Sequence, residues 1–318
     1  MLNKVKALFK NESMALLAVL VVYAIFVSSI NRNFTSWNNI RNILVQVAVP
    51  GVIAIGMFVT MLTCGTDLSV AWLLTFLSCG AVRLMTTYNV PVWAALAGLF
   101  ATAVLLEGLM GFIVAKTNLN SFIVSLGFGA MYQSFSYLIS DGSEMSAGRR
   151  LEKINTFVGG VSTLVFICAA VAIVVILMLK YTKYGRRMYA VGCNQDAAYL
   201  SGINIIRFKM SVFMLNGLLV GLAAVMQIAR LNSASPSMGS GQELSAIAAC
   251  VVGGTAMSGG KGSLVGVLIG VILLGCINNS MTMMRLSPYI ADFFKGLIIV
   301  VSVVMTYLST RPKKRASL

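Results

Sequence analysis

Four acidic side chains lie in or beside long apolar segments, at Asp67, Glu107, Glu243 and Asp292. A carboxylate held away from water is costly, so each is a candidate functional residue. Asp67 and Glu243 stand at the predicted starts of helices, where free backbone amides stabilise a carboxylate without any further role. Glu107 lies nearer the middle of its segment, and either pairing with a neighbouring helix or lining a pathway would account for it. Asp292 and Lys295 are three residues apart, which favours a local ion pair.

Other residue types restrict the chemistry further. The sequence has no histidine, which removes the commonest general base and metal ligand. Its six cysteines are not spaced as a metal site, and we interpret them as small packing residues. Residues 254–263 read GTAMSGGKGS, but Gly260 stands where a nucleotide-binding loop needs its lysine. The chain is therefore predicted not to be an enzyme, to hold no metal or cofactor, and to leave any ATP hydrolysis to another protein.

The composition identifies the surroundings of these residues. Of the 318 residues, 58% are hydrophobic and 10% are charged, whereas a soluble domain carries about 25% charged residues. A membrane span needs about 20 apolar residues, so about ten spans would use most of the chain and leave short loops. The net charge of +15 fits basic residues gathered on the inner face of a membrane better than a nucleic-acid surface. The fold class predicted is an all-α polytopic membrane protein, with residues 1–318 forming one permease-like domain.

Ten apolar segments are the predicted helices. They run at about 14–30, 43–63, 68–87, 91–115, 120–139, 157–179, 209–229, 243–257, 263–280 and 289–308. Basic residues gather at 1–12, at 180–209 and in the C-terminal tail, which places these segments on the inner side. The polar loop at 141–155 is then expected on the outer side.

Two short motifs suggest an internal repeat. Residues 65–70 read GTDLSV and open the third predicted helix, and residues 241–246 read GQELSA and open the eighth. Both have the order glycine, any residue, acid, leucine, serine, small residue. They lie five helices apart, and an odd number of helices per repeat forces opposite orientations. The pattern fits an inverted repeat of five plus five helices, which in transporters places the pathway at the repeat interface. A chance match of two short motifs is the rival explanation.

The segment 180–209 is the one long polar interruption between apolar segments, and it is strongly basic. Within it, Asn194 is a favourable N-cap, Asp196 lies near the positive end of the helix dipole, and Gly202 suits the left-handed residue that ends a helix. Between them lie good helix formers: Ala197, Ala198, Tyr199 and Leu200. We predict a cytoplasmic loop that presents a short helix to a partner protein. An ordinary basic inner loop is the simpler alternative.

Several motifs, taken together and in order, resemble the ribose-type sugar permeases of bacterial ATP-binding cassette (ABC) importers. The matching stretches are GTDLSV (65–70), NSFIVSLG (120–127), YGRRMYAVGCNQDAAYLSGIN (184–204), GQELSAIAACVVGGTAMSGGKGS (241–263), INNS (277–280) and FFKGLIIV (293–300). The likeness extends from about residue 34 to residue 305. Ala71, Cys193 and Ser280 stand where the family usually has glycine, and these small-for-small changes hardly disturb the assignment.

The resemblance implies a multi-pass subunit of the bacterial cytoplasmic membrane that translocates a simple, ribose-like sugar. A second permease copy, identical or a sister, would complete the pore; a cytoplasmic ABC ATPase would bind the ATP; and a solute-binding protein would deliver the sugar. No nucleic acid is implied. The helix that couples to the ATPase would comprise Asn194, Asp196, Ala197, Ala198, Leu200 and Gly202. The predicted pathway set is Asp67, Ser69, Glu107, Glu243, Ser245, Asn278 and Asn279.

Two alternatives stay open. A permease of the same superfamily for branched-chain amino acids or for an autoinducer would show the same helices. An ion-coupled secondary carrier would need a buried acid that titrates during transport, and Glu107 is the candidate for it. The solute itself cannot be read from the sequence, because in importers of this kind the binding protein sets most of the selectivity.

Overall fold

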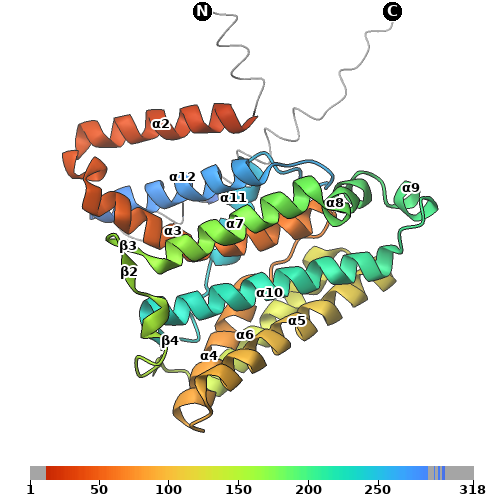
Figure 1. Cartoon of the computed structure of the whole chain (residues 1–318), viewed down its shortest axis with the longest axis horizontal. Coiled ribbons are helices and arrows are strands. Elements are labelled where there is room, and N and C mark those ends of the chain that lie inside the picture. The colour runs from red at the N-terminus through yellow and green to blue at the C-terminus, as the bar shows by residue number, and fades with distance from the viewer. Residues whose placement is uncertain (1–11, 286–289, 291–292, 294–295, 298–318) are drawn as a thin grey trace, which may run out of the picture.

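The computed structural model describes residues 12–285 together with residues 290, 293, 296 and 297. Most of this part of the chain is helical, and the long helices run side by side (Figure 1). The apolar helices are α2 (Glu12–Ile30), α3 (Trp37–Leu62), α4 (Val70–Thr86), α5 (Val92–Thr117), α6 (Ser121–Ser140), α7 (Thr163–Tyr181), α10 (Ile205–Leu231), α11 (Gln242–Val252) and α12 (Leu264–Met283). Six of them, namely α3, α5, α6, α7, α10 and α12, are long and apolar enough to cross a membrane. The chain is therefore an all-α polytopic membrane protein.

Short elements connect the long helices. A single turn of 3-10 helix, η1 (Arg32–Thr35), lies between α2 and α3, and η2 (Glu152–Ile154) lies between α6 and α7. The strands β1 (Met145–Ser146) and β4 (Ser233–Ala234) pair antiparallel, as do β2 (Phe157–Val158) and β3 (Val161–Ser162). Two short helices, α8 (Lys183–Cys193) and α9 (Gln195–Leu200), join α7 to α10. In Figure 1, α8 and α9 lie at one end of the bundle and β2, β3 and β4 at the other, so loops 180–209 and 141–155 fall at opposite ends, as predicted.

Helices α3 and α10 form the centre of the bundle. In each, 78% of the most apolar window is buried within the chain, against 22% in α6 and in α7. A run of small and branched side chains from Val47 to Leu62 has no exposed residue, so this part of α3 is packed on every side. The outer helices carry their apolar residues on the exposed surface, as lipid-facing helices do.

The structure corrects several predicted helix boundaries: α11 ends at Val252 and not at 257, α10 begins at Ile205 and not at 209, and two further helices begin six residues from their predicted starts. Helix α3 begins at Trp37 and not at 43, because the Ser36 side chain accepts a hydrogen bond from the amide of Asn39 at 3.3 Å and caps it. The polar residues from Asn38 to Asn42 thus form the first turns of a helix, where a loop was expected. Helix α7 begins at Thr163 and not at 157, because residues 157–162 form the β2–β3 hairpin.

Some predictions fall on the undescribed part of the chain. Of the tenth predicted helix, 289–308, only residues 290, 293, 296 and 297 are described, and these are helical. The predicted ion pair between Asp292 and Lys295 lies outside the described residues, as do most of both terminal segments.

Candidate functional site

The short helix predicted in the basic segment is present as α9. The Asn194 side chain accepts a hydrogen bond from the amide of Ala197 at 3.0 Å, which confirms the predicted N-cap. Gly202 has a φ of +84° and donates its amide to the carbonyl of Tyr199 at 2.9 Å, which confirms the predicted end. The sequence alone therefore located both ends of this helix.

The exposed face of α9 is partly apolar. Leu200 is 85% exposed and Tyr199 67% exposed, whereas Ala198 is 4% exposed and packs against its own chain. Asp196 and Ala197 are exposed beside them. Of the predicted coupling residues, Ala198 is therefore covered, while Tyr199, predicted only as a helix former, is exposed. Tyr199 and Leu200 give this short helix two large exposed apolar side chains outside the bundle.

Helix α8 holds α9 against the bundle. Its buried residues are Gly185, Met188, Val191 and Gly192, while Lys183, Arg186 and Arg187 are exposed. This spacing is that of an amphipathic helix, which packs one face on the bundle and turns its basic face outward. The exposed Tyr199 and Leu200 of α9 thus lie beside the basic face of α8, and both helices are at the same end of the molecule (Figure 1).

Three of the predicted pathway residues meet in the core. Asp67, Ser69 and Glu107 are all 0% exposed, and so is Asn216 of α10, which joins them. One Asp67 oxygen accepts hydrogen bonds from the amide of Ser69 at 2.8 Å and from its hydroxyl at 2.7 Å. The other Asp67 oxygen accepts from the amide nitrogen of Asn216 at 2.6 Å. The Ser69 hydroxyl and the Asn216 side-chain nitrogen also lie within reach of the Glu107 carboxylate, at 3.3 Å and 3.5 Å.

This buried cluster joins three parts of the fold: the entry to α4, the middle of α5 and the middle of α10. Asn216 fits beside α3 because residue 56 is glycine, since a Cβ there would lie 2.3 Å from the Asn216 side-chain oxygen. None of the four side chains reaches the surface in this conformation, so a pathway role for Asp67, Ser69 and Glu107 stays a prediction. Sequence reasoning missed Asn216, although an asparagine inside an apolar helix is a usable signal.

Two other predicted pathway residues line an open hollow. Ser245 of α11 and Asn278 of α12 share a hollow of about 230 Å³ with Gln46 and Gln242. Gln46 also lines a second hollow, of about 480 Å³, which lies further along α3. Because Gln46 lines both hollows, we describe them together as the polar groove, named after its polar residues: Asn38, Arg41, Asn42, Gln46, Arg230, Ser240, Gln242, Ser245 and Asn278.

The groove follows a stripe on α3. Asn38, Asn42, Gln46 and Pro50 recur every four residues and so lie on one face of the helix. Side-chain amides both donate and accept hydrogen bonds, which suits the hydroxyl groups of a polyol. Sequence reasoning missed this stripe because the first turns of α3, which contain Asn38 and Asn42, were assigned to a loop. The spacing of four between polar residues was the available signal.

The remaining predicted pathway residues lie elsewhere. Asn279 is buried, and its side-chain oxygen accepts a hydrogen bond from Asn39 at 2.9 Å, so it ties α12 to α3. Glu243 lines a hollow of about 500 Å³ whose walls are mainly apolar, including Leu68, Trp72 and Ile247. Glu243 lies in the first turn of α11, where free backbone amides stabilise a carboxylate, in agreement with the predicted place at a helix start. Its second oxygen is buried without a hydrogen-bond partner.

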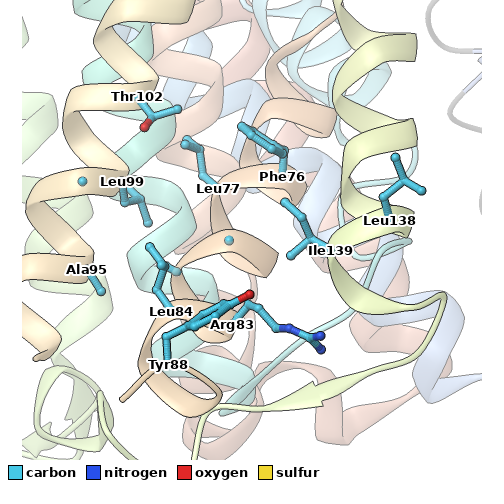
Figure 2. Close-up of a pocket in the computed structure, with 13 residues that line it drawn as sticks. Phe76, Leu77, Arg83, Leu84, Tyr88, Ala95, Leu99, Thr102, Leu138 and Ile139 are labelled. Carbon is cyan, nitrogen blue, oxygen red and sulfur yellow. The ribbon is translucent and has the colours of Figure 1, made fainter. Parts of the chain in front are cut away.

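A further hollow, of about 460 Å³, lies between α4, α5 and α6. Figure 2 shows Leu77, Leu84, Leu99 and Ile139 around it, with Arg83, Tyr88 and Thr102 as its polar members. None of the predicted pathway residues lines this hollow.

Known proteins resemble the chain over nearly its full length. Residues 39–303 match the family described as "Branched-chain amino acid transport system / permease component". The Ribose import permease protein RbsC of Escherichia coli K12 is 38% identical over 301 residues, which cover 92% of this chain and 93% of that protein. The protein of the same name in Bacillus subtilis is 36% identical, with 90% of each chain covered. The D-allose transport system permease protein AlsC of Escherichia coli K12 is 32% identical, covering 96% and 94%. The chain belongs to this family of membrane transport permeases.

Proposed function

We propose that this chain is the membrane-spanning subunit of a bacterial ABC importer and carries a simple, ribose-like sugar into the cell. The observation that carries the proposal is α9: a capped helix outside the bundle, with Tyr199 and Leu200 exposed, on a chain whose sequence lacks a nucleotide-binding loop. Such a chain would depend on a separate protein for ATP hydrolysis, and α9 would be the helix on which that protein docks. The relatives named as ribose and D-allose permeases support a sugar as the solute.

The ATPase would dock on α8 and α9. Tyr199 and Leu200 would enter a groove of that partner, in the way that exposed helical side chains anchor in apolar grooves. Lys183, Arg186 and Arg187 would face its acidic rim and speed association more than they tighten binding. ATP would be bound by that partner, and a separate solute-binding protein would deliver the sugar at the end that carries β2 and β3.

We further propose ten spans arranged as two inverted halves. Helix α3 packs against α11 and α12, and α10 packs against α4 and α5. If α3 corresponds to α10, α4 to α11 and α5 to α12, these contacts exchange between the halves as a repeat requires. The two motifs then lie close to the starts of equivalent helices: residues 65–69 directly precede α4, and residues 242–246 form the first turn of α11. The tenth span would be supplied by the segment after Met283.

The sugar would pass along the polar groove. Asn38 and Asn42 are exposed on the chain surface, so one copy supplies only one wall of a pathway. A second permease copy facing α3, α11 and α12 would supply the other wall. An amide-lined passage of this kind contacts hydroxyls without holding them tightly, which transport requires because solute must also leave.

The family description names branched-chain amino acids, which makes such a permease the second candidate. Gln46, Gln242, Ser245 and Asn278 place four polar side chains around one hollow, beside apolar residues such as Val271 and Leu274. The polar groups suit a hydroxylated solute, and the names of the ribose and D-allose permeases among the relatives favour a sugar over an amino acid. Competition of labelled ribose uptake by unlabelled sugars and by leucine would separate the two candidates.

Docking can be tested by replacing both exposed side chains of α9 with alanine. We expect Tyr199→Ala with Leu200→Ala to weaken ATPase binding at least about tenfold, because loss of roughly 1.4 kcal/mol of binding free energy has this effect. Co-purification of the ATPase with the permease from membranes measures it. Leu138→Ala is the matched control, since Leu138 is 72% exposed and lies on α6 beside Ile139 (Figure 2). It is close to the 141–155 loop, whereas α9 lies at the other end of the bundle (Figure 1). Unchanged co-purification in the α9 variant would refute the docking site.

The groove can be tested by substitutions that remove its amides and keep its size. Gln46→Leu and Asn278→Leu should each lower sugar uptake several-fold while the ATPase still co-purifies. Gln133→Leu is the control, because Gln133 lies on α6 in the wall of the apolar hollow. Equal uptake in all three variants would exclude the groove as the route.

A further inference from the structure

Three chain segments that are far apart in the sequence meet where α8 ends. They are the end of α3 with the residues that follow it (62–64), the end of α8 (192–193), and the turn between α11 and α12 (258–262). We call this meeting point the inner junction. It matters because α8 leads directly into α9, while α3, α11 and α12 carry the polar groove.

Hydrogen bonds hold the inner junction together, one between two backbone groups and the others from side chains to backbone carbonyls. The amide of Gly260 donates to the carbonyl of Leu62 at 3.0 Å. The Cys64 thiol lies 3.3 Å from the carbonyl of Gly192 and 3.0 Å from that of Ser258, so it can donate to either neighbour. From α8, the Cys193 thiol reaches the carbonyl of Gly260 at 3.5 Å. One turn earlier on α8, the Tyr189 hydroxyl donates to the carbonyl of Gly262 at 3.2 Å.

The approach is so close that Gly192 has no room for a side chain. A Cβ on Gly192 would lie 1.8 Å from the carbonyl oxygen of Leu62 and 2.5 Å from the amide nitrogen of Gly260. Both neighbours are backbone atoms, so they could move aside only if α3 or the turn moved. Gly260 has a φ of +72°, which a residue with a side chain rarely adopts. The three backbones are therefore in direct contact, without intervening side chains that could absorb a displacement.

The other end of α8 is also packed on backbone. A Cβ on Gly185 would lie 2.4 Å from the Cα atom of Leu179, near the end of α7. Helix α8 is thus packed on backbone at both ends, on α7 at its start and on the inner junction at its end. Because the amide of Asn194 donates to the carbonyl of Ala190, α9 follows α8 with no free residue between them.

We propose that the inner junction is where movement of the ATPase-bound helices enters the wall of the solute pathway, with Gly192 and Cys64 as the positioning residues. A displacement of α9 would pass along α8 to Leu62 of α3 and to the 258–262 turn. Helices α3, α11 and α12 would then move together, and these three carry Gln46, Gln242 and Asn278. This inference rests on the proposed docking of the ATPase at α9.

The experiment uses the complete transporter, with ATPase and binding protein, reconstituted in vesicles. We expect Gly192→Ala to lower the amount of sugar transported per ATP hydrolysed by roughly two- to thirtyfold, the range for mutations that alter coupling between sites. The ATPase should still co-purify, because α9 itself is unchanged. Gly98→Ala is the matched control, since Gly98 is also in a helix and has nothing within 4 Å of an added Cβ.

A second pair of variants decides the matter if Gly192→Ala does not fold. Cys64→Ala removes the thiol donor without adding bulk, and we expect a smaller fall in sugar per ATP. Cys64→Ser keeps a donor and should restore part of the loss. Normal coupling in Cys64→Ala, or in a folded Gly192→Ala protein, would overturn the inference, as would an equal fall in Gly98→Ala. Failure of the docking proposal is distinguished by a separate result: co-purification of the ATPase would then not depend on Tyr199 and Leu200.

Discussion

The similar motifs GTDLSV at 65–70 and GQELSA at 241–246 lie at the starts of α4 and α11, yet they have different surroundings. Leu68 is 7% exposed and Leu244 is 50% exposed. Ser69 is buried in the cluster with Asp67, whereas Ser245 lines the polar groove. The Asp67 carboxylate has hydrogen bonds from Ser69 and Asn216, whereas Glu243 keeps one oxygen without a partner. The first motif therefore holds core helices together, whereas the similar second motif lies on a surface beside the polar groove.

The difference follows from what covers each motif. The first is enclosed by α5, α6 and α10: Glu107 and Asn216 face Asp67, and the Ser125 hydroxyl accepts a hydrogen bond from the amide of Leu68 at 3.0 Å. The second contacts mainly α12 and α3 and stays open on its other side. If a second copy closes the groove, the surroundings of the second motif change on assembly, while those of the first do not.

The largest contrast should come from truncating the two leucines. Leu68→Ala should lower the free energy of unfolding by about 2–4 kcal/mol, because it removes a buried side chain and leaves a cavity. Leu244→Ala removes a half-exposed side chain and should cost less than about 1 kcal/mol. Thermal unfolding of the purified permease in detergent measures both. Equal losses for the two variants would mean that the second motif is as enclosed as the first.

A smaller effect is expected from removing the amide that reaches Asp67. Asn216→Ala should lower the free energy of unfolding by about 1–3 kcal/mol, the usual cost of leaving a buried polar group without its hydrogen-bond partner. Asn278→Ala in the groove should leave stability nearly unchanged and lower uptake instead. The same thermal assay, run beside an uptake assay, checks both variants. The contrast fails if Asn278→Ala destabilises the chain as much as Asn216→Ala does.

The sequence predicted the helical framework well, because long apolar runs leave little choice of secondary structure. It also predicted both ends of α9, since Asn194 and Gly202 act locally on their own turns of chain. Boundaries failed where local signals were weak: the polar residues from Asn38 to Asn42 suggested a loop, although Ser36 caps them into α3.

The candidate sites were harder to predict because they depend on which helices meet. Asp67 and Glu107 were singled out separately, but nothing local indicates that Asn216, more than 100 positions later, donates to both. The predicted pathway set proved to be spread over the buried cluster, the groove, the α3–α12 contact and an apolar hollow. Only tertiary packing distinguishes these four locations, because in the sequence all of the predicted residues are polar groups in or beside apolar segments.

The smallest effect should come from neutralising Glu243. In Glu243→Gln, the side chain keeps its length, and the buried atom without a hydrogen-bond partner becomes part of a neutral amide. Burying a neutral amide costs less than burying a charge, so we expect the free energy of unfolding to rise by up to about 1 kcal/mol. Uptake should stay unchanged, because the groove is lined by Gln242 and Ser245 on another face of α11. A fall in uptake without a loss of stability would instead assign Glu243 to the solute pathway and make the two motifs functionally different, beyond their difference in burial.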